Sequence, residues 1–237
     1  MTTYKVERAV DKTHLAQKAC QVIASHIDLV LGKRDRAQVA FSGGSTPSEA
    51  YRLLSQEHLP WDRVDLFLGD ERWVDQEDKA SNAGMIHRTL LASGPGAACK
   101  FHAIPTIQCP NPQESAEAFS QLLTKLCLGK PPIFDLILLG LGDDGHTASL
   151  FPESDSLKVN DCWATVGTAK GQERVTLTAP VLSAARKVVF LVSGSSKQIA
   201  LQRLMDPYEP SSRTPARLVQ PNSEILILAD DEASSLI

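Results

Sequence analysis

The sequence predicts a single-domain α/β protein with a mostly parallel sheet flanked by helices in a Rossmann-like arrangement. Short runs that are apolar on both faces, as in strands buried between two layers, alternate with helical segments. The chain has 237 residues, about one and a half typical domains. Its 43% hydrophobic and 22% charged residues are typical of a globular protein that buries a sizeable core. We therefore expect one domain over residues 1–237.

The order of apolar and helical segments follows this scheme along the chain. Asp11 or Thr13 can cap a first helix that runs to Leu31, where apolar residues recur at helical spacing and Gly32 follows. A proline-rich segment, residues 206–221, precedes the last strand and is expected to be an active-site or surface loop. Strands are predicted at 37–42, 64–69, 101–104, 134–140, 174–178, 187–193 and 224–229, and helices at 82–91, 114–128 and 196–205.

Composition excludes several classes of partner and location. A net charge of −4 gives no basic field for a nucleic-acid backbone. No apolar run approaches the ~20 residues that cross a bilayer, and the N-terminus lacks a secretory signal. Five cysteines without a CxxC pair indicate neither a disulfide framework nor zinc, so a cytoplasmic protein without a metal is expected. Cys99, His102 and Cys109 fit no metal-ligand spacing and are predicted to be buried thiols and a loop histidine.

A glycine-rich loop follows the strand predicted at 37–42. Gly43 and Gly44 allow backbone amides to approach an anion closely, and Ser42 and Thr46 add hydroxyl donors. Pro47 suits the first turn of a following helix, whose free N–H groups and dipole favour phosphate. A plain tight turn is the alternative, but the combination favours a phosphate site. It is not a Walker sequence, because no GK[ST] follows.

Charged residues come directly after the strand predicted at 64–69. Asp70, Glu71 and Arg72 would lie at the carboxyl end of this strand, where open α/β sheets bind ligands. They could equally be solvated, and for Glu71 we expect that state. Both interpretations of these residues, a polar binding site and a plain charged loop, therefore remain open.

The segment at 134–152 is the most informative. Its three glycines match GxGxxG, but a proline seven residues after the last glycine and the lack of a suitably placed acidic residue argue against a dinucleotide site. The turn presents Asp143, Asp144 and His146 beyond the most apolar strand. A histidine there can take a proton from water if a carboxylate fixes its tautomer, and Asp144 is placed to do so. The absence of a GxSxG sequence disfavours a serine hydrolase.

Two further cations are found near the strand predicted at 174–178: Lys170 lies just before it, and Arg174 is its first residue. They could be solubilising loop charges. In an acidic chain with a candidate phosphate loop, they are the best charge partners for the anion.

Taken together, these blocks resemble the 6-phosphogluconolactonase family, within the fold shared with glucosamine-6-phosphate deaminase. The resemblance runs over nearly the whole chain, and the block GDDGHTASLFP is its most specific part. Lys79 and Ala80 depart from it, since family members often carry a histidine and an acidic residue there. The similar blocks are SGGSTP at 42–47, GDERWV at 69–74, SN at 81–82, LGLGDDGHTASLFP at 139–152, RVTLT at 174–178 and VSGSSK at 192–197.

The resemblance implies a fold of the sugar-phosphate isomerase/lactonase type. It also implies hydrolysis of a small-molecule sugar-phosphate lactone, 6-phospho-D-glucono-1,5-lactone, in the oxidative pentose phosphate pathway, with no cofactor. His146 would be the catalytic base, with Asp144 orienting it and Arg72 beside the lactone. The substrate and its phosphate would be bound by Ser42, Gly43, Gly44, Thr46, Asp70, Lys170 and Arg174.

Two alternatives to this function remain. An amino-sugar-phosphate deaminase or isomerase of the same fold is disfavoured, because Leu150 and Phe151 stand before Pro152 where such deaminases have an acidic residue. A non-catalytic sugar-phosphate-binding protein would need neither His146 nor its neighbouring carboxylates. The sequence leaves the oligomeric state open, a homo-oligomer included.

Overall fold

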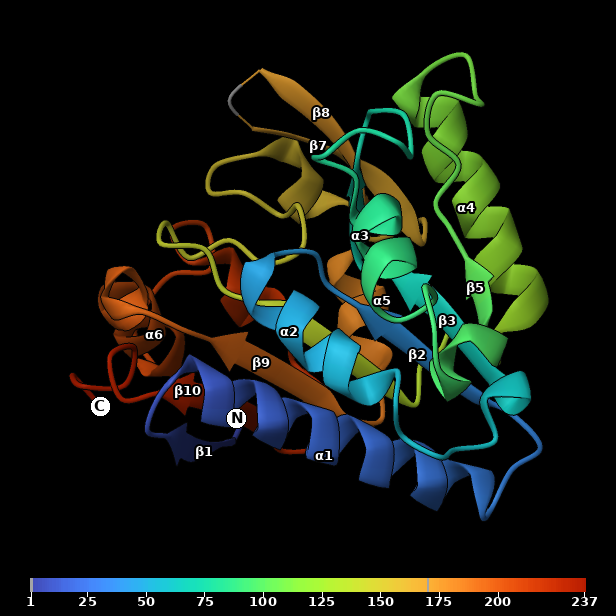
Figure 1. The fold of residues 1–237 in the computed structure, drawn as a ribbon. Coiled ribbons are helices and arrows are strands. Elements are labelled where there is room, and N and C mark those ends of the chain that lie inside the picture. Colours follow the sequence, from blue (N-terminus) through green and yellow to red (C-terminus); the bar gives the residue numbers. More distant parts are fainter. Residues whose placement is uncertain (1, 170) are drawn as a thin grey trace.

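The computed structural model describes residues 2–169 and 171–237, so the candidate phosphate ligand Lys170 lies outside the described residues. A seven-stranded sheet in the order β1-β10-β9-β6-β2-β3-β5 forms the centre, and its strand pairs are parallel (Figure 1). The predicted α/β fold is thereby confirmed. The strands are β1 (Tyr4–Ala9), β2 (Ala37–Phe41), β3 (Val64–Leu68), β5 (Lys100–His102), β6 (Leu136–Gly140), β9 (Val188–Val192) and β10 (Ile225–Asp230).

Helices cover both faces of this sheet; in Figure 1, α1, α2 and α3 lie in front of it and α5 lies behind. Of the two capping residues that the sequence allowed for α1, Asp11 is the N-cap, and its carboxylate accepts the backbone N–H of His14 at 2.8 Å. The helices are α1 (Lys12–Leu31), α2 (Ser45–Leu54), α3 (Asn82–Thr89), α4 (Pro112–Leu126), α5 (Ala179–Ala184) and α6 (Gln198–Met205).

A second, antiparallel sheet of three strands stands beside the first, in the order β4 (Asp70–Arg72), β8 (Gln172–Leu177) and β7 (Ala164–Ala169). The strand predicted at 174–178 belongs to this sheet. Gly69 joins the two sheets, because its N–H donates to Phe41 O in the parallel sheet and its carbonyl accepts the N–H of Leu177. The charged residues after β3 therefore form a strand of their own.

The strand order places a ligand site between β2 and β6. From β2 the chain adds β3 and β5 toward one edge of the sheet, and from β6 it adds β9 and β10 toward the other. Such a reversal opens a crevice at the carboxyl ends of the strands, where doubly wound folds bind ligands. Within the described ranges, no helix is long and apolar enough to cross a membrane.

Candidate active site

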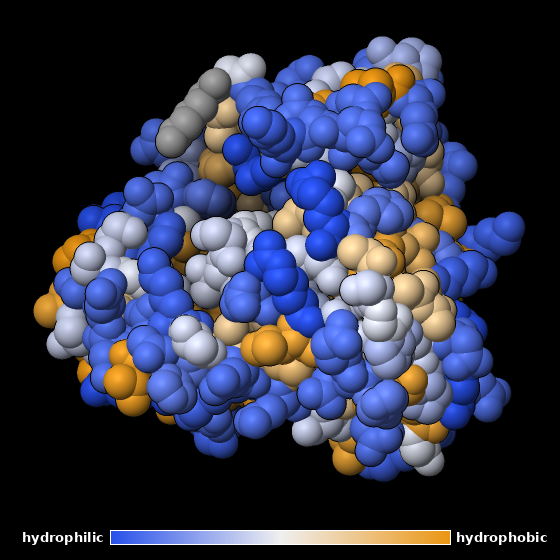
Figure 2. Space-filling view, viewed as in Figure 1, coloured by the Kyte–Doolittle hydropathy of each residue, from blue (hydrophilic) through white to orange (hydrophobic). Residues whose placement is uncertain are grey.

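A cavity of about 290 Å³ lies at this reversal, where the loops after β2, β3, β6 and β9 meet. The molecular surface is hollowed beneath the β7–β8 hairpin (Figure 2). Eight of the ten residues that the sequence singled out line the cavity together, which are Ser42, Gly43, Gly44, Thr46, Asp70, Arg72, His146 and Arg174. Asp144 does not line the cavity but is hydrogen-bonded to His146, which does, and Lys170 is outside the described residues.

His146 and Asp144 form a directly hydrogen-bonded pair on the turn after β6. The imidazole Nδ1 lies 2.6 Å from Asp144 Oδ1, and the backbone N–H of His146 donates to the same oxygen at 3.0 Å. Burial acts to raise the pKa of Asp144, but the hydrogen bonds and the charge of His146 outweigh it and hold that pKa below its ordinary value. A carboxylate can only accept hydrogen bonds, so Nδ1 carries a proton and Nε2 is left with a lone pair.

Packing fixes the plane of this imidazole. A side chain at Gly142 would collide with the His146 ring and the Asp144 carboxylate, so glycine is required there. On another side the ring of Phe151 lies 4.6 Å from the imidazole, between ring centroids. The Arg174 guanidinium also lies over the Phe151 ring, with its Cζ 5.4 Å from the ring centroid. One aromatic ring thus supports two of the predicted site residues.

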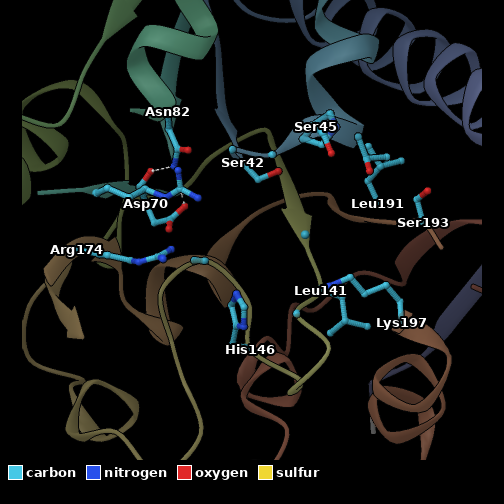
Figure 3. Close-up of a pocket in the computed structure, with 18 residues that line it drawn as sticks. Ser42, Ser45, Asp70, Asn82, Leu141, His146, Arg174, Leu191, Ser193 and Lys197 are labelled. Atoms are coloured by element: carbon cyan, nitrogen blue, oxygen red, sulfur yellow. Dashed lines mark hydrogen bonds between the residues drawn. The ribbon is translucent and has the colours of Figure 1, made fainter. Parts of the chain in front are cut away.

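Asp70 lies opposite His146 across the cavity and is almost fully buried (Figure 3). Ser149 Oγ donates to its Oδ2 at 2.5 Å, and Asn82 donates to its backbone carbonyl at 2.8 Å. These contacts fix the carboxylate at the edge of the cavity. Asn82 lines the cavity too, although the sequence analysis noted it only as part of the SN block.

The expectation that Glu71 is solvated is wrong. Its side chain is 1% exposed, and its carboxylate accepts the backbone N–H groups of Arg72, Asn82 and Ala83 at 2.7–2.8 Å. Burial raises the pKa of Glu71, against the effect of these hydrogen bonds. Glu71 satisfies free N–H groups at the start of α3 and ties β4 to that helix, so its role is structural.

Arg72 and Arg174 are directly opposite each other in the β4–β8 register. Both Nε atoms are buried and, among the described residues, have no hydrogen-bond partner. Burial lowers the pKa of Arg174, and the positive charge of Arg72 acts in the same direction, while the charge of Asp70 opposes both. Like charges directly opposite each other destabilise a sheet, so this arrangement favours an anionic group between the two guanidinium groups.

The glycine-rich loop leads into α2 as the sequence predicted. Gly44 is the N-cap of α2 and provides no side-chain cap, so the first N–H groups of the helix are free for an anion. Ser45 and Thr46, in that first turn, line the cavity. Ser42 Oγ is buried there and, among the described residues, makes no hydrogen bond.

Lys197 is a cation of the cavity to which the sequence analysis gave no role. It comes from the turn after β9, and in Figure 3 it lies on the opposite side of the cavity from Arg174. Its Nζ is 3.7 Å from a carboxylate oxygen of the exposed Asp143. Asp230 at the end of β10 holds the turn, accepting Ser193 Oγ at 2.5 Å and the N–H of Gly194 at 3.0 Å. Its position just after a buried strand, within the VSGSSK block, is the sequence signal that could have identified Lys197 as a site residue.

No group of three histidine, cysteine, aspartate or glutamate side chains gathers as a metal site in the described part of the chain. Cys99 and Cys109, buried and half-buried, are free thiols. His102 was predicted both within a short strand and as a loop histidine; it lies in β5, where Nε2 is 2.8 Å from the carboxylate of Asp65.

Comparison with known proteins identifies the family. The model of the family of glucosamine-6-phosphate isomerases and 6-phosphogluconolactonases matches residues 10–228, and the chain belongs to this family. A 6-phosphogluconolactonase from Synechocystis sp. is 38% identical over 97% of this chain and 96% of its own length. One from Nostoc sp. is 37% identical over 97% of both chains. Among solved structures, the 6-phosphogluconolactonase of Trypanosoma brucei superposes with a TM-score of 0.87 at 26% identity, over 99% of both chains.

Proposed function

We propose that this protein hydrolyses 6-phospho-D-glucono-1,5-lactone to 6-phospho-D-gluconate, the second step of the oxidative pentose phosphate pathway. The full-length likeness to 6-phosphogluconolactonases at 37–38% identity supports this substrate. The observation that carries the proposal is the pair of His146 and Asp144 beside a cavity that also holds the start of α2. That combination provides a base and a phosphate site within one small volume.

His146 is the proposed base. Its Nε2 removes a proton from water as the water oxygen attacks the lactone carbonyl carbon. The tetrahedral intermediate then collapses, the bond from this carbon to the ring oxygen breaks, and the imidazolium returns the proton to the leaving ring oxygen. Asp144 stabilises the imidazolium and keeps the proton on Nδ1.

Arg72 and Arg174 are proposed to bind the lactone end of the substrate. Negative charge develops on the carbonyl oxygen during attack and persists on the product carboxylate. Two half-buried guanidinium groups opposite each other, each with a buried Nε, would stabilise that charge in a partly dehydrated site. Asp70, held by Ser149, is proposed to accept hydrogen bonds from hydroxyl groups of the sugar.

The phosphate is proposed to lie at the other end of the cavity. Ser42, Gly43, Gly44 and Thr46 supply hydroxyl and backbone donors there, and Lys197 supplies the positive charge. Arg174, which the sequence suggested for the phosphate, lies across the cavity from Lys197, and this favours a place at the lactone end (Figure 3). Binding at a remote phosphate positions the carbonyl relative to His146.

Turnover of freshly prepared lactone, with spontaneous hydrolysis subtracted, tests the proposed function. His146→Asn should fold normally and still bind 6-phosphogluconate, while kcat falls by ~10²–10⁴, the usual share of a positioned acid–base group. His14→Asn is a matched control, since His14 forms the same kind of pair with Asp11, at 2.9 Å, on the exposed start of α1. A stable His146→Asn variant with near-normal kcat would eliminate His146 as the base and direct attention to Asp70.

The same assay separates the alternatives. A sugar-phosphate-binding protein without activity would bind 6-phosphogluconate and leave the lactone to its spontaneous rate. A deaminase would release ammonia from glucosamine 6-phosphate. The solved monomeric glucosamine-6-phosphate deaminase shares the fold, with a TM-score of 0.83, but only 20% of its residues are identical, so the lactonase is the better-supported activity.

A further inference from the structure

The proline-rich segment at 206–221 lies directly behind the turn that carries His146. None of its residues lines the cavity. Thr214 packs against Gly145, where an added Cβ would lie only 3.0 Å from Thr214 Cα and Cγ2. The φ of +90° at Gly145 is in itself unfavourable for any residue with a side chain. The backbone N–H of Ala216 donates to Gly145 O at 3.0 Å. The segment therefore supports the turn by packing and by a backbone hydrogen bond.

A buried carboxylate holds this segment in shape. Glu209 is 8% exposed, and its Oε1 accepts the hydroxyl of Thr214 at 2.6 Å and Nε of Arg213 at 2.9 Å. The Arg213 side chain is 58% exposed, so the contact with Thr214 is the shielded one. Thr214 itself is fully buried. Loss of this hydrogen bond would leave a buried carboxylate short of a donor, and the segment would have to shift.

The turn in front of Thr214 has little freedom of its own. Gly145 N donates to Gly142 O at 3.0 Å, and Gly142 N donates to His146 O at 2.8 Å. A displacement of Gly145 therefore moves the backbone of His146 and, with it, the imidazole. The glycine-rich loop and α2, at the proposed phosphate end, make none of these contacts.

We infer that Glu209 is a positioning residue for His146, acting through Thr214 and Gly145. This inference rests on the proposed hydrolysis, in which His146 must be aligned with a water molecule and a carbonyl carbon. A misalignment by a fraction of an ångström lowers the rate of such a step without weakening substrate binding. The phosphate end is unaffected, so KM should not change.

Two isosteric variants test the inference. Glu209→Met removes both acceptor oxygens and keeps the length of the side chain, and Thr214→Val removes the hydroxyl while keeping the volume beside Gly145. Each should lower kcat by about tenfold with KM unchanged. The double variant should be no worse than the more affected single variant, because both changes break the same bond. Arg213→Ala is the control, since it removes the exposed partner of Glu209, and its kcat and KM should stay at the wild-type values.

Amide hydrogen exchange provides a readout that does not depend on turnover. In Glu209→Met and Thr214→Val, exchange should become faster at residues 142–147 and in the 206–221 segment, and stay unchanged in α2. A wild type that fails to hydrolyse the lactone would refute the proposed function, and exchange would still test the positioning. Unchanged exchange at 142–147 would overturn the inference. So would a faster exchange throughout the chain with kcat per folded molecule unaltered, since that outcome indicates a role in stability alone.

Discussion

Replacing Lys197 by methionine tests which cation binds the phosphate. The substitution removes the charge and keeps most of the aliphatic stem. A hydrogen bond to a charged group contributes ~1.5–3 kcal/mol, and each ~1.4 kcal/mol corresponds to a factor of ten in binding. The existing contact with the exposed Asp143, at 3.7 Å, is weak and competes little. We therefore expect Lys197→Met to raise KM by roughly 10- to 150-fold and to leave kcat nearly unchanged, because the lactone carbonyl is proposed to bind at the other end of the cavity.

The assay is the initial rate of lactone hydrolysis over a wide concentration range, with inorganic phosphate as a competing ligand. Its inhibition constant should rise together with KM in Lys197→Met. Lys158→Met is the control, because Lys158 is 81% exposed and pairs with Asp155 on the surface. An unchanged KM in folded Lys197→Met would refute the reasoning. If Arg174→Met raised the inhibition constant of inorganic phosphate instead, the phosphate cation would be Arg174, as the sequence alone suggested.

Two further outcomes follow from the geometry of the chain. Activity should survive exhaustive treatment with EDTA, since no three potential ligand side chains converge in the described residues; loss of activity that Mg²⁺ or Zn²⁺ restores would contradict a metal-free mechanism. Burial acts to raise the pKa of Asp65, but hydrogen bonds from Arg36 and His102 outweigh it and hold that pKa below its ordinary value. The stability that this carboxylate contributes is then present above about pH 4 and is lost as the pH falls through the lowered pKa. Asp65→Asn should therefore melt below the wild type at pH 7, and the gap should narrow toward pH 3, whereas a gap of constant size would rule out the linkage.

Burial on both faces explains which strands the sequence reveals. Every residue of β3, β9 and β10 is buried, and such runs are visible as mostly apolar stretches, with Asp65 inside β3 and Asp230 at the end of β10 as the exceptions. β1 is half-exposed at the edge of the sheet and mixes charged with apolar residues, so it carries no comparable signal. β4 consists of three charged residues, two of which line the cavity, and it pairs with a strand about one hundred positions away. Local patterns contain no information about such pairing.

In the candidate site, too, contacts between neighbouring residues can be predicted from the sequence, whereas contacts between distant segments cannot. His146 and Asp144 are two residues apart in the sequence, so a short local motif is enough to specify their contact. Glu71 instead accepts hydrogen bonds from α3, eleven and twelve residues later, and its burial follows from a helix position that the motif does not encode. Glu209 reaches the turn of His146 through contacts between segments about seventy residues apart. Motifs thus identify the groups that are proposed to react, and the tertiary structure identifies the groups that hold them in place.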